Sequence, residues 1–162
     1  MKLPVRPLVF AAGLLLSLNA LAEPAPEFTL PDAAGNTISL SQQRGKIVYV
    51  DFWASWCGPC RQSFPWMNEM LGKYQAQGLE ILAINLDTGR AEADEFLAKN
   101  PASFTVLFDP TATLPPQYAV KGMPTSYLID ASGEIILQHA GFNASHRESL
   151  EASIQQALET LQ

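Results

Sequence analysis

The chain contains very little cysteine and histidine, with two residues of each among its 162. A fold that depends on several disulfides is therefore excluded. A zinc site takes about four ligands, and His139 and His146 lie far along the chain from the cysteines, without the spacing of a zinc finger. We expect no bound metal and no cofactor.

Basic residues are also scarce. The sequence has 10 Lys and Arg against 16 Asp and Glu, for a formal net charge of −6, and the basic residues form no cluster. This balance argues against nucleic acid and against an anionic membrane surface as partners.

Long apolar runs are missing except at the N-terminus. Lys2 and Arg6 precede an apolar stretch over residues 8–21, and Ala20-Leu21-Ala22 fits the small-residue pattern of a cleavage site. The stretch is short for a membrane span. These features are typical of a secretory signal peptide.

We therefore predict a signal peptide over residues 1–22 and a single domain over residues 23–162, located in the periplasm. The alternative is an uncleaved segment that anchors the protein in the inner membrane through residues 8–21. Disulfides form and persist outside the cytosol. An exported domain with one closely spaced cysteine pair is expected to use that pair for chemistry.

The two cysteines form a CxxC pair within Trp56–Cys60, whose sequence is WCGPC. The apolar run before it, Ile47–Phe52, predicts a buried strand, and a helix is expected from about residue 59 to 77. Both thiols then lie at a helix start, where partial positive charge and free N–H groups stabilise a thiolate. The pattern predicts a dithiol/disulfide redox site.

Three other interpretations of the pair stay open at this point. It could be half of a zinc site, although other soft ligands are few. It could be a structural disulfide, although a CxxC bridge closes a very short loop and constrains the unfolded chain little. It could also be two inert buried thiols, for which Gly58, Pro59 and Trp56 are poor surroundings.

The remaining pattern predicts an α/β domain with a central mixed sheet, helices on both faces and an N-terminal β-hairpin extension. A short leader, residues 22–26, is expected to wrap the surface. The last helix is expected to open with a capping box, Ser145 to Glu148. The expected strands cover residues 28–30, 36–40, 46–52, 79–85, 105–108, 126–129 and 135–139, and the expected helices cover residues 59–77, 90–99 and 145–161.

Two segments resemble thioredoxin. Asp51–Arg61 (DFWASWCGPCR) closely resembles the thioredoxin active-site segment, and Pro65 matches the proline of the following helix. Val120–Thr125 (VKGMPT) resembles the segment that carries the cis-proline of that fold. Ala25–Gly35 (APEFTLPDAAG) resembles the opening hairpin of the exported TlpA/ResA-like thioredoxins and of peroxiredoxins. The resemblance implies a thioredoxin fold over most of the chain.

Peroxiredoxins are the close rival. That family places a proline seven residues, and a Thr or Ser three residues, before its peroxide-reactive cysteine. Val50 and Ala54 occupy those positions here. A thiol peroxidase is therefore kept as an alternative, although the hydroxyl donor of such a site is missing here.

The resemblance also implies roles for the site residues. Cys57 is the exposed nucleophile and Cys60 the resolving thiol. Asp51 lies beneath the site, where burial raises its pKa and it can exchange a proton with Cys60. Thioredoxin places a lysine beside this carboxyl, whereas alignment puts Ala83 there.

Pro124 is implied to be cis and to lie against the disulfide, where the Met123 backbone can pair with an extended substrate. Trp56, Pro59, Met123 and Thr125 are the expected substrate-binding residues, with 141–142 at the edge of the same apolar surface. Trp53 is expected in the core, and the two histidines are expected to be structural or solvated.

The Gly-Pro dipeptide between the cysteines accompanies a reducing potential in thioredoxin. We therefore predict a monomeric periplasmic disulfide reductase of exported client proteins, re-reduced by a membrane-borne electron donor. Cytochrome c maturation is an alternative task, although Thr125 stands where members devoted to it often have Glu. A non-catalytic binding module is the remaining alternative.

Overall fold

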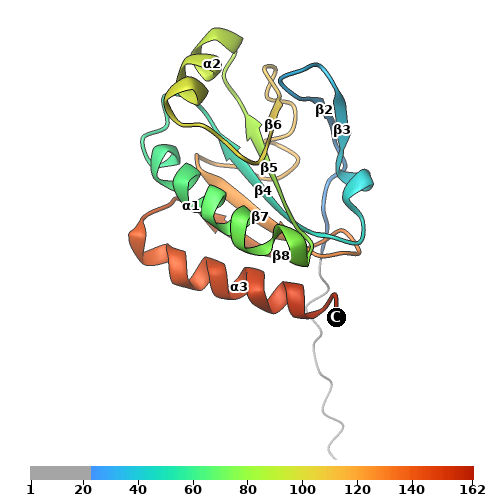
Figure 1. Ribbon diagram of the computed structural model, residues 1–162. Helices are drawn as coiled ribbons and strands as arrows, with labels where there is room; N and C mark the ends of the chain where they lie inside the picture. The colour runs from blue at the N-terminus through green and yellow to red at the C-terminus, as the bar shows by residue number, and fades with distance from the viewer. Residues whose placement is uncertain (1–22) are drawn as a thin grey trace, which may run out of the picture.

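The computed structural model describes residues 23–162. The predicted signal peptide and the alternative anchor over residues 8–21 lie outside the described residues. A six-stranded sheet occupies the centre of the molecule (Figure 1), and a separate two-stranded hairpin lies beside it. The strands are β1 (Glu23–Pro24), β2 (Thr29–Pro31), β3 (Thr37–Ser39), β4 (Ile47–Trp53), β5 (Leu79–Asn85), β6 (Thr105–Phe108), β7 (Thr125–Ile129) and β8 (Glu134–Ala140).

The central sheet is mixed, as the sequence predicts. Its strand order is β1-β8-β7-β4-β5-β6. β4, β5 and β6 are parallel, whereas β7 is antiparallel to β4 and β8 is antiparallel to β7. All seven residues of β4 are buried, as expected of a continuous apolar run covered on both faces.

One face of the sheet is covered by α-helices. These are α1 (Cys60–Tyr74), α2 (Arg90–Lys99) and α3 (Arg147–Glu159). α1 and α3 lie side by side (Figure 1), and Tyr74 Oη donates a hydrogen bond to Glu151 Oε1 at 2.7 Å between them. Buried side chains of all three helices join the side chains of Tyr49 and Trp53 in one core.

The other face has a different cover. Phe28 from the hairpin segment, Leu40 from the 3₁₀-helix η1 (Leu40–Gln43), and Leu114 and Tyr118 from the loop after β6 pack against β4. The predicted helices on both faces are therefore α-helices on one face and the short 3₁₀-helix η1 on the other. Pro115 and Pro116 lie at the start of a turn in this loop, in which the Tyr118 N–H donates to the Leu114 carbonyl at 3.1 Å.

Two local expectations are wrong. The leader does not merely wrap the surface: β1 pairs with the edge strand β8, and the Ala25 N–H donates to the Gly133 carbonyl at 2.9 Å. Ser145 does not cap α3. A 3₁₀-turn, η3 (Ala144–His146), precedes the helix, and the Asn143 side chain caps that turn.

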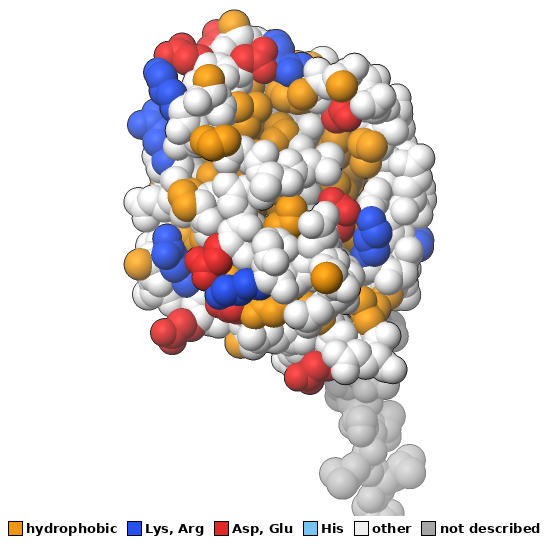
Figure 2. All heavy atoms as spheres, viewed as in Figure 1, with side chains coloured by type: hydrophobic (Ala, Val, Ile, Leu, Met, Phe, Trp, Pro, Cys, Tyr) orange, Lys and Arg blue, Asp and Glu red, His pale blue; other side chains and the backbone are white. Residues whose placement is uncertain are grey.

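The helices and the surface charges of the described residues bear on contact with membranes. No helix within residues 23–162 is long and apolar enough to cross a membrane. On the face seen in Figure 2, acidic and basic side chains are interspersed rather than gathered by sign.

Candidate functional site

Cys57 and Cys60 form a disulfide at the point where β4 leads into α1. The S–S distance is 2.02 Å and the two Cα atoms lie 5.3 Å apart. Cys60 is the first residue of α1, and its backbone N–H donates to Cys57 Sγ at 3.3 Å. The first sulfur therefore lies at a helix N-terminus, where free N–H groups and the helix dipole favour negative charge.

The two sulfurs are less accessible than the sequence suggested. Cys57 is 4% exposed and Cys60 is fully buried, so Cys57 is the outer residue of the pair but is not openly exposed. The neighbouring Trp56 is 71% exposed. The surface beside the disulfide is thus presented by this indole and by the exposed Pro59.

Asp51 is buried on the same face of the sheet as α1. Its neighbours at alternate positions of β4, Tyr49 and Trp53, belong to the core that also contains both cysteines. Asp51 is 1% exposed, and its Oδ2 has no hydrogen-bond partner among the described residues. Burial raises the pKa of this carboxyl well above its usual range. Ala83 stands directly opposite on β5, which agrees with the alignment and places no cation at that position.

A row of polar residues crosses the sheet from Asp51. Ser126 on β7 is paired with Asp51, and His139 on β8 is paired with Ser126. Residues directly opposite one another in antiparallel strands lie on the same face. His139 Nε2 lies 3.0 Å from His146 Nδ1, and burial together with His146 lowers the pKa of His139. This pairing could not be predicted from the sequence, because composition does not reveal strand register.

The proline loop has the predicted backbone. The Met123–Pro124 peptide bond is cis, Pro124 is buried and Met123 is half-buried. The Thr125 side chain is 3% exposed, and its hydroxyl donates to the Gly122 carbonyl at 2.6 Å. This bond joins the two ends of the loop.

Two hollows lie beside the site. One, of about 410 Å³, is lined by Ser55, Trp56, Arg61 and residues of α2. The other, of about 380 Å³, follows the proline loop from Lys121 to Thr125 and reaches Gly141. Either hollow could receive part of an extended polypeptide.

Phe142, expected on the docking surface, Trp53, expected in the core, and Trp66, for which the sequence favoured neither position, are all buried. Phe142 is 6% exposed and packs against Trp66, with ring centroids 5.4 Å apart. It belongs to the core and not to the predicted docking surface, and Trp66 is likewise a core residue. Trp53 is fully buried, as predicted.

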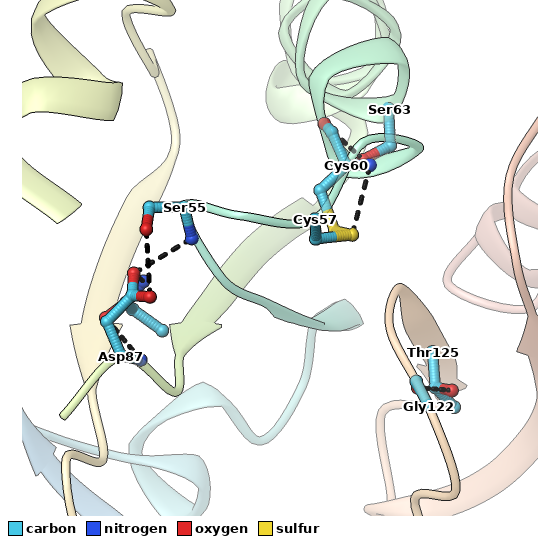
Figure 3. Close-up of a disulfide and its surroundings, with 8 residues drawn as sticks. Ser55, Cys57, Cys60, Ser63, Asp87, Gly122 and Thr125 are labelled. Carbon is cyan, nitrogen blue, oxygen red and sulfur yellow. Dashed lines mark hydrogen bonds between the residues drawn. A yellow bond between two sulfur atoms is a disulfide. The ribbon is translucent and has the colours of Figure 1, made fainter. Parts of the chain in front are cut away.

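Two residues that sequence reasoning did not assign lie next to the cysteine turn. Asp87 accepts hydrogen bonds from the backbone N–H and the hydroxyl of Ser55, both at 2.9 Å. In the view of Figure 3 this contact lies on one side of the disulfide, and the Gly122–Thr125 loop lies on the other. The only signal in the sequence was a polar pair at the end of a buried strand, with Asn85 as its last residue and Asp87 two positions further on.

No group of three or more His, Cys, Asp or Glu side chains within residues 23–162 could hold a metal ion. The chemistry that the described residues supply is that of two cysteines at a helix start, a buried carboxyl and a cis-proline loop on a mixed sheet. This arrangement defines a thioredoxin-fold thiol-disulfide oxidoreductase.

The comparisons with known proteins agree. The AhpC/TSA family model matches residues 21–138, and the chain belongs to that family. It is 37% identical to the thiol-disulfide oxidoreductase ResA of Geobacillus kaustophilus over 116 residues, which cover 72% of this chain and 67% of the relative. It is 33% identical to ResA of Bacillus cereus over 135 residues, or 83% and 77% of the two chains.

Solved structures show the same likeness. A putative thiol:disulfide interchange protein DsbE from Chlorobium tepidum superposes with a TM-score of 0.83 at 54% identity, covering 85% of this chain and 96% of that one. A putative protein disulfide isomerase from Bacteroides thetaiotaomicron gives a TM-score of 0.78 at 27% identity, covering 85% and 89%.

Proposed function

We propose that this oxidoreductase works as a periplasmic disulfide reductase of exported proteins, with Cys57 as nucleophile and Cys60 as resolving thiol. The observation that carries the proposal is the position of Cys57 Sγ, which accepts the N–H of the first α1 residue. A thiolate at that position is stabilised and reactive near neutral pH.

The reaction proceeds by two exchanges. The Cys57 thiolate attacks one sulfur of a client disulfide, so that a Cys57–client bond forms and the other client sulfur leaves as a thiolate. Cys60, as its thiolate, then attacks Cys57 Sγ. The Cys57–Cys60 bond forms, the second client thiolate leaves with the electron pair, and the client is reduced by two electrons.

Asp51 is proposed to take up the Cys60 proton before the second exchange. A neutral buried acid cannot accept a proton, so the carboxyl must ionise before it acts as a base. With Ala83 opposite, ionisation receives no help from a neighbouring cation. Asp51 and Cys60 lie on the same face of the sheet, in the layer covered by α1.

The client is proposed to lie across the two hollows. Trp56, Pro59 and Met123 supply the exposed and half-exposed apolar contacts. The backbone of the Met123–Thr125 loop supplies polar groups for an extended chain. A non-catalytic binding module could use the same surface. Only a requirement for the two cysteines in the protein's activity distinguishes an oxidoreductase from such a module.

The direction of electron flow is proposed from the Gly58-Pro59 dipeptide, which accompanies a reducing potential in thioredoxin. Export, proposed from residues 1–22, would place the protein in an oxidising compartment. Each cycle leaves an oxidised Cys57–Cys60 pair, so a membrane-borne dithiol donor is required to reduce it again. We propose that the protein acts as a monomer.

The peroxidase alternative receives no support from the site. Ala54 is fully buried, and its carbonyl accepts the Cys57 N–H at 3.1 Å. An alanine side chain at this position offers a peroxide no hydroxyl. The cytochrome c alternative concerns which client is used and leaves the exchange chemistry unchanged.

Trapping tests the proposal. Cys60→Ala is expected to accumulate mixed disulfides with exported proteins, because the second exchange cannot occur. Cys57→Ala is the matched control and should trap none. The same pair can be assayed on a synthetic peptide disulfide, where only Cys60→Ala should form a stable adduct. If neither variant forms adducts, or both do equally, the assignment of the two cysteines is wrong.

A further inference from the structure

The turn that carries Cys57 is attached to the neighbouring strand through one buried carboxylate. Asp87 lies two residues after β5 and is 7% exposed. Its Oδ2 accepts the Ser55 backbone N–H at 2.9 Å and the Asn85 side-chain amide at 2.7 Å, and its Oδ1 accepts the Ser55 hydroxyl at 2.9 Å. Asn85 Oδ1 in turn accepts the Asp87 N–H at 3.1 Å.

These bonds act on the segment where the reactive sulfur is placed. Ser55 stands two residues before Cys57, between the end of β4 and the start of α1. Trp56, the residue between Ser55 and Cys57, is largely exposed and contributes little packing to the turn. The remaining backbone link within the turn is the Cys57 N–H to the Ala54 carbonyl. The Leu86 N–H donates to the Trp53 carbonyl at 2.9 Å where β4 ends, and within the turn itself the contact with the segment after β5 is made by Asp87.

A buried carboxylate with three donors is costly to disturb. Replacing it by an amide would remove the charge and leave one acceptor oxygen in place of two, so at least one of the three donors would lose its acceptor in a mostly dry site, which is unfavourable. Neither the Ser55 N–H nor the Asn85 side-chain amide has a second acceptor among the described residues. The turn would then move to reach water.

We infer that Asp87 is a positioning residue for the reactive turn, holding Cys57 Sγ at the N-terminus of α1 within reach of Cys60. The inference rests on the proposed function, since it concerns the same two thiols. It assigns Asp87 no contact with the substrate and no part in proton transfer.

The expected consequence is a change in the thiol–disulfide equilibrium. Disulfide formation between Cys57 and Cys60 is favoured by their high effective concentration, which depends on the turn geometry. A looser turn lowers this concentration in the dithiol form. The Cys57–Cys60 disulfide of the variant should then be reduced more readily than that of the wild type.

The experiment compares Asp87→Asn with Asp109→Asn in equilibrium with glutathione. Asp109 is the matched control, because it is a 2% exposed carboxylate that accepts the N–H groups of Thr113 and Leu114 in a loop distant in sequence from the cysteines. Thermal unfolding of both variants measures the general cost of each change. The disulfide equilibrium constant and the rate of reduction of a peptide disulfide measure the effect of each change on the Cys57–Cys60 pair.

Both variants are expected to lose stability. Only Asp87→Asn should lower the equilibrium constant for disulfide formation, by roughly tenfold, which corresponds to about 30 mV. Asp109→Asn should stay within about twofold of the wild type. The inference is overturned if Asp87→Asn loses stability with an unchanged constant and rate, or if Asp109→Asn changes them equally.

Ser55→Ala provides a second, milder variant should Asp87→Asn fold poorly. It removes the hydroxyl bond and keeps the backbone bond to Asp87, so a shift of roughly twofold to threefold in the same direction is expected. No shift in Ser55→Ala together with an unfolded Asp87→Asn would make Asp87 a stability residue only. A wild-type protein that does not exchange with glutathione would instead contradict the proposed function itself.

Discussion

Asp51 is the residue whose environment departs most from an ordinary carboxyl. It is buried, its Oδ2 has no partner among the described residues, and Ala83 stands opposite. The nearby Tyr49 hydroxyl has a raised pKa, mainly through its own burial and then through Asp51. Both groups are therefore more stable in the neutral form at this position.

Asp51→Asn should remove a pH dependence of the free energy of unfolding. The pKa of Asp51 is raised in the folded state, so the folded protein binds an extra proton between the unfolded and folded pKa values. The stability of the wild type relative to Asp51→Asn is then highest below about pH 4 and falls by about 1.4 kcal/mol per pH unit toward the folded pKa. Urea unfolding of both proteins from pH 4 to 8 measures this, and a constant difference would contradict it.

The same variant is expected to slow the second exchange. If Asp51 accepts the Cys60 proton, its loss should lengthen the lifetime of a Cys57–peptide mixed disulfide by roughly 10²-fold or more. Rapid-quench kinetics at pH 7 measure the lifetime. As pH rises toward the ordinary range of a thiol, the difference should shrink, because Cys60 then ionises without a base. A lifetime equal to that of the wild type would exclude the carboxyl from the step.

At the scale of elements, the start of α3 shows how local patterns can mislead. Ser145-x-x-Glu148 fits a capping box, yet Asn143 Oδ1 accepts the Ser145 N–H at 2.9 Å and the Ser145 hydroxyl at 2.6 Å. The intervening turn, η3, moves the cap two residues toward the N-terminus. Asn is at least as good an N-cap as Ser, and short-range patterns do not distinguish the two registers.

Asn143→Ala should destabilise the protein by about 1 kcal/mol, the usual cost of losing an N-cap. Ser145→Ala keeps the backbone bond to Asn143 and should cost only a few tenths of that value. Chemical denaturation of the two variants distinguishes the assignments. A larger loss of stability in Ser145→Ala than in Asn143→Ala would identify Ser145 as the N-cap, as the capping box predicts.

Much of the fold could be predicted because its signals are local. The apolar run of β4 and the helical spacing of α1 identify buried elements without knowledge of their neighbours. β1 could not be found, because Glu23 and Pro24 carry no strand pattern and are ordered by pairing with β8.

The site divides in the same way. Cys57 and Cys60 are recognisable from their CxxC spacing alone. The contact of Asp87 with Ser55 joins positions 32 apart in sequence, and the row from Asp51 to His139 depends on strand register. Such relations arise only when the sheet is assembled, so sequence spacing does not contain them.

At the scale of the whole molecule, we expect the fold to be independent of its disulfide. Two buried clusters, one on each face of the sheet, supply the core. The bridge joins residues only three apart, so it constrains the unfolded chain weakly. A large core and a short disulfide loop are expected of a redox pair and not of a disulfide that stabilises the fold.

Replacing both cysteines, Cys57→Ser with Cys60→Ser, should therefore leave a folded protein at 25 °C. Loop entropy for so short a loop corresponds to a loss of about 2 kcal/mol. Urea unfolding of this variant and of the oxidised wild type measures the difference. An unfolded double variant would favour a structural disulfide.

The central claim is that the Cys57–Cys60 pair exchanges reversibly and in the reducing direction. Its most direct test is the standard potential of the pair, measured by equilibration with glutathione or dithiothreitol. The account predicts a value near that of thioredoxin, about −270 mV. A value near that of DsbA, about −120 mV, would make the protein an oxidant and contradict the claim.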